Sequence, residues 1–336
     1  MFNKIYEKIK LFIKDNYKFF ISAFLIIFIF NYEFPYIIYK SGGLINLEDR
    51  IDIDKEYVEK GSFNMSYVTA IKGTIPFLAI SLVLPDWDIL PIKEVTNDMS
   101  YEETIVIGKE YLNEGIDNAI ISAFKLSKYN INIDKYINTV LFISDKADTD
   151  ILLGDEIISI NDKEVKDLIS LREYINTLKE NDRVKLLVNN NGKEYERYAV
   201  LYKDSDDLLK VGVSFKTTYK YTTEIPVSIK MKDNESGSSG GLMMALSIYN
   251  ALTDEDITHG KKIAGTGSIT SDGVVEEIGG VKYKVLGAYN NKADVFLCPE
   301  ENYKEAMNIK KKRNLDIEIV KVHTLEDAVN YLENLN

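Results

Sequence analysis

An uncharged stretch near the N-terminus constrains the fold of this chain more than any other feature of its sequence. Phe19 to Phe30 contains no charged residue, and the apolar character continues to Tyr39 with Glu33 as the single charge. At a rise of about 1.5 Å per residue, these roughly 20 residues would measure about 30 Å as a helix, the thickness of the hydrocarbon core of a bilayer. The sequence therefore predicts a transmembrane helix over residues 19–39.

The charges on either side of this stretch predict its orientation. Acidic residues follow it, from Glu48 to Asp54, whereas five lysines precede it: Lys4, Lys8, Lys10, Lys14 and Lys18. Because basic residues favour the cytoplasmic side, we expect residues 1–18 to form a cytoplasmic tail and the bulk of this single-pass chain to lie outside the cell membrane. A cleaved signal peptide is the alternative, but the apolar run exceeds a typical h-region and no small-x-small cleavage site follows it.

Composition excludes several classes of function. The 336 residues carry a net charge of −12, which disfavours binding to the phosphates of nucleic acids. Cys298 is the single cysteine and His259 and His323 are the two histidines, too few for a cysteine- or histidine-rich metal site. We expect the cysteine to be buried and the histidines to lie on the surface. Segments of the types HExxH, GxGxxG and GxxxxGK[ST] do not occur, so the sequence predicts no metal and no cofactor.

Residues 40–125 are predicted to form a β-rich segment followed by a connector helix. Alternating apolar residues from Phe63 to Tyr67 predict a strand, and the apolar run from Phe77 to Leu84 is interpreted as another. Ser100 and Glu103 form a capping-box pattern ahead of apolar residues at helical spacing, with Gly115 as a weak point of the helix.

Residues 126–205 carry a pattern of short strands around one helix. Strands are predicted at 139–143, 156–160, 184–188 and 195–201, and a helix near 171–178. The segment from Leu152 to Val165, in which Gly154-Asp155 precedes alternating isoleucines and a tight turn, resembles the hairpin of PDZ domains. The resemblance implies that a peptide adds as a strand beside the helix. A glycine-rich carboxylate loop is not found before Thr139, so a spacer domain without a ligand stays an alternative.

The last third of the chain holds a glycine-rich loop ahead of an apolar helix. Gly237 to Gly241 reads Gly-Ser-Ser-Gly-Gly, after a strand predicted at 225–231 and before a helix predicted at 242–249. Glycines around a serine at a helix start let a substrate backbone approach closely and direct free N–H groups at a developing oxyanion. Ser239 is therefore the candidate nucleophile, and it needs a base because a serine hydroxyl is a weak nucleophile.

Lys282 is the candidate base, in the first turn of a helix that follows Gly279 and Gly280. A lysine base must be neutral, so its pKa must fall from about 10.4 toward 7 or 8, which requires roughly 4 kcal/mol of selective destabilisation of the ammonium form. Burial beside Ile278 and Val281 and the positive end of the helix dipole both act in that direction. The alternative is a solvated lysine on the helix surface, with the serines acting as a helix cap.

Together these segments resemble the proteolytic domain of Lon-type Ser-Lys endopeptidases. Ser239 and Lys282 are 43 positions apart, and Thr266 to Ile269 lies between them as the matching Thr-Gly-x-Ile segment of a domain expected over residues 206–336. The resemblance implies that the serine attacks the scissile carbonyl and that the lysine takes its proton and later returns it to the leaving amine. It also implies that Thr266 aims the lysine.

The residues around the nucleophile complete the resemblance with two departures. Gly237, Ser238 and Gly240 support the loop, but Ser238 stands where the family usually has proline and Glu235 where it has aspartate. One anchor, a PDZ-like domain and a Lon-type domain without an ATPase resemble the membrane-bound PDZ-containing members of the family. The fold class is then α/β in the α+β sense, and the expected function is ATP-independent, limited cleavage of extracytoplasmic polypeptides, with homo-oligomerisation left open.

Two other functions stay open. Gly237 to Gly241 also fits the G-x-S-x-G pattern, and Ser239, Asp294 and His323 follow the chain order of an α/β-hydrolase esterase. That fold needs several parallel strands before the serine, whereas the preceding segment is predicted to be a small β domain. The third function is a membrane-tethered PDZ binding scaffold whose Lon-like domain is inactive.

Overall fold

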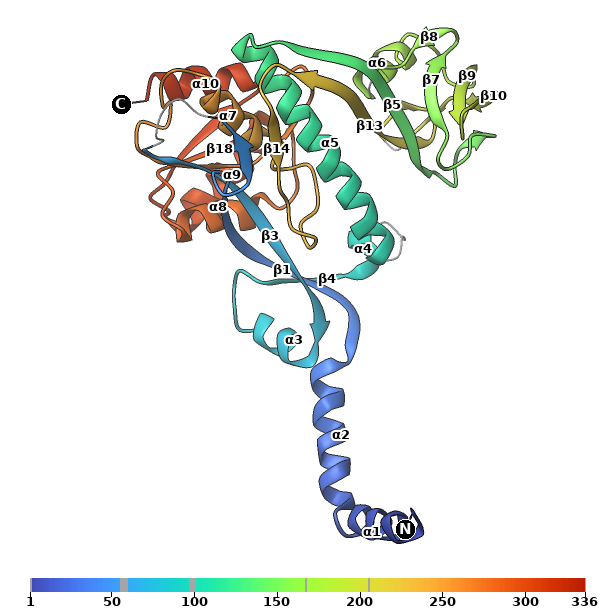
Figure 1. Ribbon diagram of the computed structural model, residues 1–336, viewed down its shortest axis with the longest axis vertical. Coiled ribbons are helices and arrows are strands. Elements are labelled where there is room, and N and C mark those ends of the chain that lie inside the picture. The colour runs from blue at the N-terminus through green and yellow to red at the C-terminus, as the bar shows by residue number, and fades with distance from the viewer. Residues whose placement is uncertain (1, 55–59, 97–100, 167, 205, 336) are drawn as a thin grey trace.

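The computed structural model describes residues 2–54, 60–96, 101–166, 168–204 and 206–335. Figure 1 shows helices α1 (Phe2–Asp15) and α2 (Tyr17–Asn31) projecting from one end of a central body. A smaller, β-rich part lies beside this body, and the long helix α5 (Tyr101–Ser127) runs between the two. The central body contains both the N-terminal strands and the C-terminal third of the chain.

Helix α2 contains the apolar run but not the whole predicted span. It has 15 residues and ends at Asn31, and strand β1 (Glu33–Asn46) begins two residues later. Glu33 pairs with Thr74 on the neighbouring strand and forms an ion pair of 2.8 Å with Lys72, so strand pairing ends the helix. The prediction of one helix over residues 19–39 is therefore wrong in its extent. Across the described ranges, every helix falls short of the combined length and apolar character that crossing a bilayer requires.

A six-stranded sheet of order β19-β18-β15-β3-β1-β4 forms the centre of the body. Its middle strand β3 pairs antiparallel with β1 on one side and parallel with β15 on the other, so the N-terminal hairpin completes the sheet of the C-terminal third. The remaining bounds are β3 (Ser62–Thr74), β4 (Asp88–Pro91), β15 (Lys262–Gly265), β18 (Val295–Pro299) and β19 (Glu318–Val322).

Helices cover both faces of this sheet, and strand β18 shows the two cores. Val295 and Leu297 belong to the core formed with α5, α7 (Gly241–Ala251) and α10 (Leu325–Glu333). Phe296 and Cys298 belong to the core formed with α8 (Val281–Asn290) and α9 (Glu300–Arg313), because successive strand residues point to opposite faces. The predicted burial of Cys298 is confirmed.

The smaller part is a seven-stranded sheet with one helix, α6 (Leu168–Ile175). Its order is β13-β5-β7-β9-β10-β6, with β8 paired to β7, so β13 lies at an edge. The predicted strand at 156–160 and the turn at Asn161 and Asp162 are confirmed, and both turn residues have a positive φ. The bounds are β5 (Ile131–Ile143), β6 (Asp148–Thr149), β7 (Glu156–Ile160), β8 (Lys163–Glu164), β9 (Arg183–Asn190), β10 (Lys193–Val200) and β13 (Val213–Thr223).

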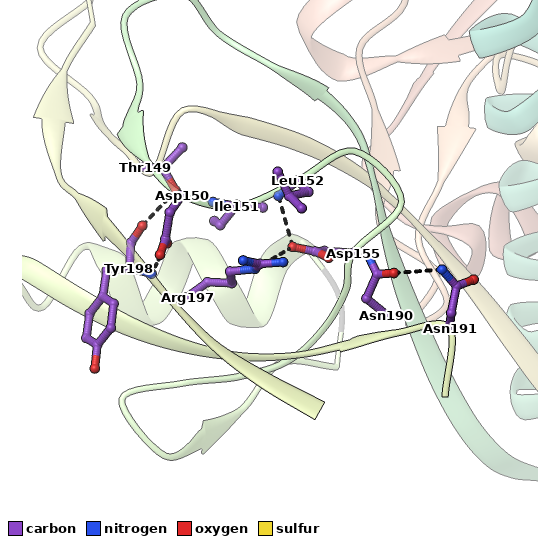
Figure 2. A network of polar contacts seen from close by, with 9 residues as sticks. All are labelled: Thr149, Asp150, Ile151, Leu152, Asp155, Asn190, Asn191, Arg197 and Tyr198. Atoms are coloured by element: carbon purple, nitrogen blue, oxygen red, sulfur yellow. Dashed lines mark hydrogen bonds and ion pairs between the residues drawn. The ribbon is translucent and has the colours of Figure 1, made fainter. Parts of the chain in front are cut away.

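A buried carboxylate connects the strands of this smaller part (Figure 2). Asp155, from the predicted PDZ-like hairpin, accepts hydrogen bonds from Arg197 Nε at 3.1 Å, Asn190 Nδ2 at 2.6 Å and the Leu152 backbone N–H at 2.9 Å. A fully buried charge is tolerated only when it is paired and hydrogen-bonded. Asp155 therefore fixes the turn ahead of β7 to strands β9 and β10.

The apolar run after β3 forms a helix, so the prediction of a strand there is wrong. Helix α3 (Ile75–Ser81) has Pro76 in its first turn, where the missing N–H has no helical partner to lose. The predicted connector helix is confirmed as α5, whereas its predicted cap Ser100 lies outside the described residues. The other elements are α4 (Ile92–Thr96), β2 (Ile51–Ile53), β11 (Tyr202–Lys203), β12 (Leu209–Lys210), β14 (Val227–Ile229), β16 (Ser268–Ile269) and β17 (Val275–Glu276).

Candidate active site

The serine loop, residues 236–240, leads into helix α7. Ser239 is half-buried and lines a cleft of about 1020 Å³ together with Gly237 and Gly240. Gly237 has a φ of +91°, a left-handed conformation that glycine adopts without steric cost. The loop thus presents the candidate nucleophile to an open cleft at the N-terminus of a buried helix.

Thr266 and Gly267 hold the backbone of the candidate nucleophile. Thr266 Oγ1 donates a hydrogen bond to the carbonyl oxygen of Ser239 at 3.0 Å, and the Gly267 N–H donates to the same oxygen at 2.9 Å. The Thr266 side chain is completely buried. Two donors on one carbonyl fix the position of the serine relative to the turn that follows β15.

Lys284 approaches the same threonine. Its Nζ donates to Thr266 Oγ1 at 3.1 Å, and its side chain is 4% exposed. Burial lowers the pKa of this amine from its ordinary 10.5 to about 8, because desolvation disfavours the ammonium form. A continuous chain of hydrogen bonds therefore connects the Lys284 amine, the Thr266 hydroxyl and the Ser239 carbonyl.

The structure directs Lys282, the predicted base, to a different partner. Its Nζ lies 2.5 Å from Asp88 Oδ2, and Tyr283 donates to the same oxygen at 2.6 Å. Burial acts to raise the pKa of Asp88, but the hydrogen bonds from Lys282 and Tyr283 outweigh it and the pKa is lowered. The partner of the Lys282 amine is therefore Asp88 rather than the serine loop, and this geometry does not fit the assignment of the base to Lys282.

Helical geometry explains why two lysines so close in sequence have different surroundings. Residues two positions apart on a helix are separated by about 200° around its axis, so Lys282 and Lys284 lie on opposite faces of α8. Lys284 shares its face with the buried Val281 and Ala288, at spacings of −3 and +4. The sequence shows that the two lysines lie on different faces, but which face is buried follows from the packing of α8.

Gly280 sets the start of this helix. It caps α8 with a φ of +74°, and a Cβ there would lie 2.8 Å from Val68 Cγ2 on strand β3. Both the left-handed backbone and the close approach require glycine. The helix can therefore begin against the sheet and carry Lys284 inward.

Helix α5 supports the serine loop from the other side. The Gly237 N–H donates to the carbonyl oxygen of Gly108 at 2.7 Å, within α5. About two turns further along, a Cβ at Gly115 would lie 3.2 Å from the Cα of Ser238. Ser238 Oγ also forms a hydrogen bond of 2.7 Å with Ser268 Oγ on β16. Gly115, predicted as a weak point of the helix, is thus a close contact between helix and loop.

An ion pair holds the segment that precedes the serine loop. Glu235 Oε1 lies 2.8 Å from Arg50 Nη2, and both side chains are largely buried. The other carboxylate oxygen accepts the backbone N–H of Lys232 at 2.7 Å. The glutamate that replaces the usual aspartate of the family pattern therefore ties this segment to the end of the N-terminal hairpin.

The cleft beside Ser239 contains a free strand edge. Strand β3 pairs with β15 up to Met65, and beyond that residue its pairing within the described strands is with β1 alone. Residues 66–70 of β3 line the cleft, together with apolar side chains that include Ile45, Met65, Leu112 and Met231. An extended polypeptide can therefore pair with β3 and pass the candidate nucleophile.

A second cavity, of about 460 Å³, lies between the two parts of the molecule. Its walls come from α6 and β13 on one side and from α5 and Ser238 on the other. Helix α5 contacts β13 through side chains: Glu114 Oε1 accepts the Thr217 N–H at 3.0 Å, and Tyr221 donates to Asp117 at 3.1 Å. The strand beside α6 at this cavity is β13, the edge strand of the sheet. It comes after the PDZ-like hairpin in the chain, whereas the carboxylate loop would come before Thr139.

The residues of the esterase alternative do not converge on the serine. Asp294 Oδ2 accepts the Lys262 backbone N–H at 2.7 Å, and the backbone N–H of His323 donates to Asp327 at 3.1 Å. Both side chains are exposed, at the ends of strands β18 and β19. The predicted surface position of both histidines is confirmed, and the arrangement gives the esterase alternative no geometric support.

Two family models match this chain. Residues 213–333 match the Lon protease (S16) C-terminal proteolytic domain, and residues 123–197 match the PDZ domain. The chain therefore contains a Lon-type proteolytic domain and a PDZ domain. The first of these matches includes the serine loop, Thr266 and both lysines.

Curated relatives and solved structures match parts of the chain. The Lon protease of Campylobacter concisus is 32% identical over 148 residues, 44% of this chain and 18% of that protein. The Lon protease of Endomicrobium trichonymphae is 29% identical over 138 residues, 41% of this chain and 17% of that protein. This chain thus spans less than a fifth of the length of these relatives. The PDZ domain of an SdrC-like protein from Listeria monocytogenes is 22% identical, with a TM-score of 0.22 and coverage of 23% of this chain and 85% of that one.

Proposed function

We propose that this chain, with its Lon-type proteolytic domain and PDZ domain, is a serine endopeptidase that uses Ser239 as nucleophile and Lys284 as base. The observation that carries the proposal is the buried contact of Lys284 with Thr266, which itself holds the backbone of Ser239. Thr266 keeps the role predicted for it, to aim the lysine, but the lysine is the one two positions later.

The lowered pKa gives Lys284 the protonation state that a base needs. A fall from 10.5 to about 8 raises the neutral fraction near pH 7 roughly 300-fold, equivalent to about 3 kcal/mol. This is close to the roughly 4 kcal/mol that a lysine base requires. Burial alone supplies the effect, without a neighbouring cation.

Catalysis then proceeds in two halves. Lys284 Nζ takes the proton of Ser239 Oγ as the Oγ–carbon bond forms, and the backbone N–H groups of Ser239 and Gly240 stabilise the oxyanion. The carbon–nitrogen bond breaks as Lys284 returns its proton to the leaving amine. A water molecule, deprotonated by Lys284, hydrolyses the acyl-enzyme and restores the serine.

The cleft supports a polypeptide substrate bound as an extended strand. Residues 66–70 of β3 offer unpaired backbone groups, and the apolar lining accepts apolar side chains near the cut. We propose limited cleavage of flexible polypeptides without ATP, with a further stretch of polypeptide held between α6 and β13 in the second cavity.

Membrane anchoring and an extracytoplasmic site of action belong to the same proposal. Helix α2 exposes large apolar side chains along its length, with Phe19 68% and Phe24 66% exposed, and its described residues include none that is buried. Such a surface is stable only when a protein or lipid partner covers it. The lysines that precede α2 favour anionic cytoplasmic headgroups, which would place the proteolytic domain on the opposite side.

Activity on a flexible peptide tests the proposal. The full chain should cleave an unstructured fluorogenic peptide with the same rate in the presence and absence of ATP, and an organophosphonate probe should label Ser239. The Ser239→Ala variant should lose both signals. If Ser239→Ala still cleaves the peptide and is still labelled, the serine is not the nucleophile. If the unaltered chain neither cleaves the peptide nor reacts with the probe, the inactive binding scaffold is favoured.

A further inference from the structure

The apolar segment from Ile75 to Leu84, which we call the foot, is a surface that catalysis does not use. It contains helix α3 and the three residues after it, and it carries no charged residue. Leu82 is 81% and Val83 80% exposed, and the other large apolar residues with substantial exposure are Ile75, Phe77, Ile80 and Leu84. Contiguous apolar exposure on this scale marks a binding surface.

The position of the foot identifies what covers it. Helix α3 contacts α2, and Figure 1 shows it at the end of the hairpin where α2 leaves the body. Strand β3 ends at Thr74, which pairs with Glu33 just after α2, so the foot begins at the level where α2 enters the body. Any surface that embeds the upper end of α2 therefore also reaches the foot.

Aromatic residues at this level fit the headgroup region of a bilayer. Tyr32 and Tyr36 are 46% and 38% exposed between α2 and the hairpin, and the ring of Phe34 packs on Tyr32 at 4.8 Å. Amphipathic aromatic rings favour the membrane–water interface. At the other end of α2, the amphipathic helix α1 carries Lys8, Lys10 and Lys14. Their positive charges match the anionic headgroups of the opposite membrane surface.

We propose that the foot is a second membrane contact, which lies in the headgroup and acyl boundary of the bilayer that holds α2 and fixes the height of the proteolytic domain above it. The inference rests on the proposed membrane anchoring. An interfacial apolar segment of this kind is buried about 5 to 10 Å into the boundary region. The occupant is a lipid surface rather than a second copy of the chain, because the foot is continuous with α2 and uncharged.

Tryptophan fluorescence tests the contact, because the chain has a single tryptophan. Trp87 precedes β4, whose Asp88 pairs with Tyr39, six residues along β1 from Glu33. Its backbone N–H also donates to the carbonyl oxygen of Leu84, the last residue of the foot, at 3.3 Å, so Trp87 lies too close to the foot to act as a control. Replacing Trp87 by phenylalanine gives a background in which a single introduced tryptophan reports its own surroundings.

The experiment reconstitutes the full chain in vesicles of phosphatidylcholine and phosphatidylglycerol with bromine on the acyl chains. Trp87→Phe combined with Leu82→Trp should lose emission in brominated relative to unbrominated vesicles, and in both it should emit at shorter wavelength than a tryptophan exposed to water. Trp87→Phe combined with Leu153→Trp, a matched control at a residue 64% exposed on the PDZ domain, should show neither change. Val83→Trp is a second probe of the foot, for use if the Leu82 variant does not fold.

The outcomes separate this inference from the proposals it rests on. Equal emission of both foot probes in brominated and unbrominated vesicles, with the chain still floating with the vesicles, overturns the membrane contact and leaves the anchor. A shift to shorter wavelength without quenching means that protein covers the foot, and it also overturns the inference. Failure to float overturns both the anchor and the contact. Peptide cleavage measured in the same vesicles tests the protease separately.

Discussion

Replacing Glu114 by glutamine should stabilise the protein above neutral pH. This carboxylate lies on α5 at the contact with β13, where its Oε1 accepts the Thr217 N–H at 3.0 Å. Burial raises its pKa from 4.5 to about 7, and the nearby carboxylates of Glu276 and Asp117 add to the increase. The hydrogen bond from Thr217 and the charge of Lys216 lower the pKa but do not offset the increase. The ionised form is therefore costly in the folded protein.

The size of the effect follows from the pKa. A change from 4.5 to about 7, at about 1.4 kcal/mol per pKa unit, corresponds to about 3 kcal/mol. Because the folded pKa is the higher one, the stability contributed by the protonated carboxyl is fully present below about pH 4.5 and is lost as the pH rises through about 7. Glutamine keeps a carbonyl acceptor for Thr217 but never ionises.

Urea unfolding of the full chain in mild detergent, followed by circular dichroism, measures the difference. Glu114→Gln should change the free energy of unfolding little at pH 4.5 and increase it by up to about 3 kcal/mol at pH 8.5. Glu110→Gln, on the same helix, is the matched control. It loses an ion pair with Lys216 and should lower stability by at most about 1 kcal/mol. An equal effect of Glu114→Gln at both pH values, or a loss of stability at pH 8.5, would refute the reasoning.

Three further results are expected. The value of kcat/KM for peptide cleavage should rise with pH and reach half of its plateau near pH 8, where the Lys284 amine loses its proton; a profile that falls over that range would exclude a neutral amine as the base. Gly115→Ala should lower kcat, because the new Cβ would lie 3.2 to 3.3 Å from atoms of Ser238 and displace the serine loop. This is expected even though alanine favours a helix over glycine by about 1 kcal/mol. An unchanged kcat would show that the loop tolerates the contact. Asp155→Ala should lower the free energy of unfolding of the PDZ domain by about 3 kcal/mol or more, because it leaves Arg197 without its buried partner. Hydrogen exchange of the backbone amides from β7 to β10 should increase, whereas cleavage of a short peptide should persist.

The sequence was informative where local chemistry decides the structure. The Gly-Asp hairpin of the PDZ domain and the helix after the serine loop were predicted from turn and glycine patterns, and the structure confirms both elements. In each of them the signal lies within a few neighbouring residues. Such signals need no knowledge of distant contacts.

The sequence was less informative where packing decides. Glu33 belongs to a strand because it pairs with Thr74, which is far away in the sequence. The apolar run from Phe77 lies largely in helix α3, which begins directly after the hairpin strand β3 ends. Local hydropathy shows neither of these arrangements. The position of Gly115 against Ser238 likewise depends on how α5 crosses the serine loop.

The proposed base, Lys284, depends on how helix α8 packs. Lys282 and Lys284 both follow the glycine pair, and distance in sequence favoured the first. Lys284 is nearly fully buried, on the face of α8 that it shares with Val281 and Ala288. The outer face meets Asp88, a residue far away in the sequence.

Substitution of each lysine by methionine tests the central claim most directly, with peptide cleavage by the full chain as the measurement. Methionine keeps most of the side-chain length and removes the amine. Lys284→Met should reduce kcat by about 10² to 10⁴, the usual contribution of a general base, whereas Lys282→Met should stay within several-fold of the unaltered chain. Full loss of activity in Lys282→Met together with retained activity in Lys284→Met would contradict the account.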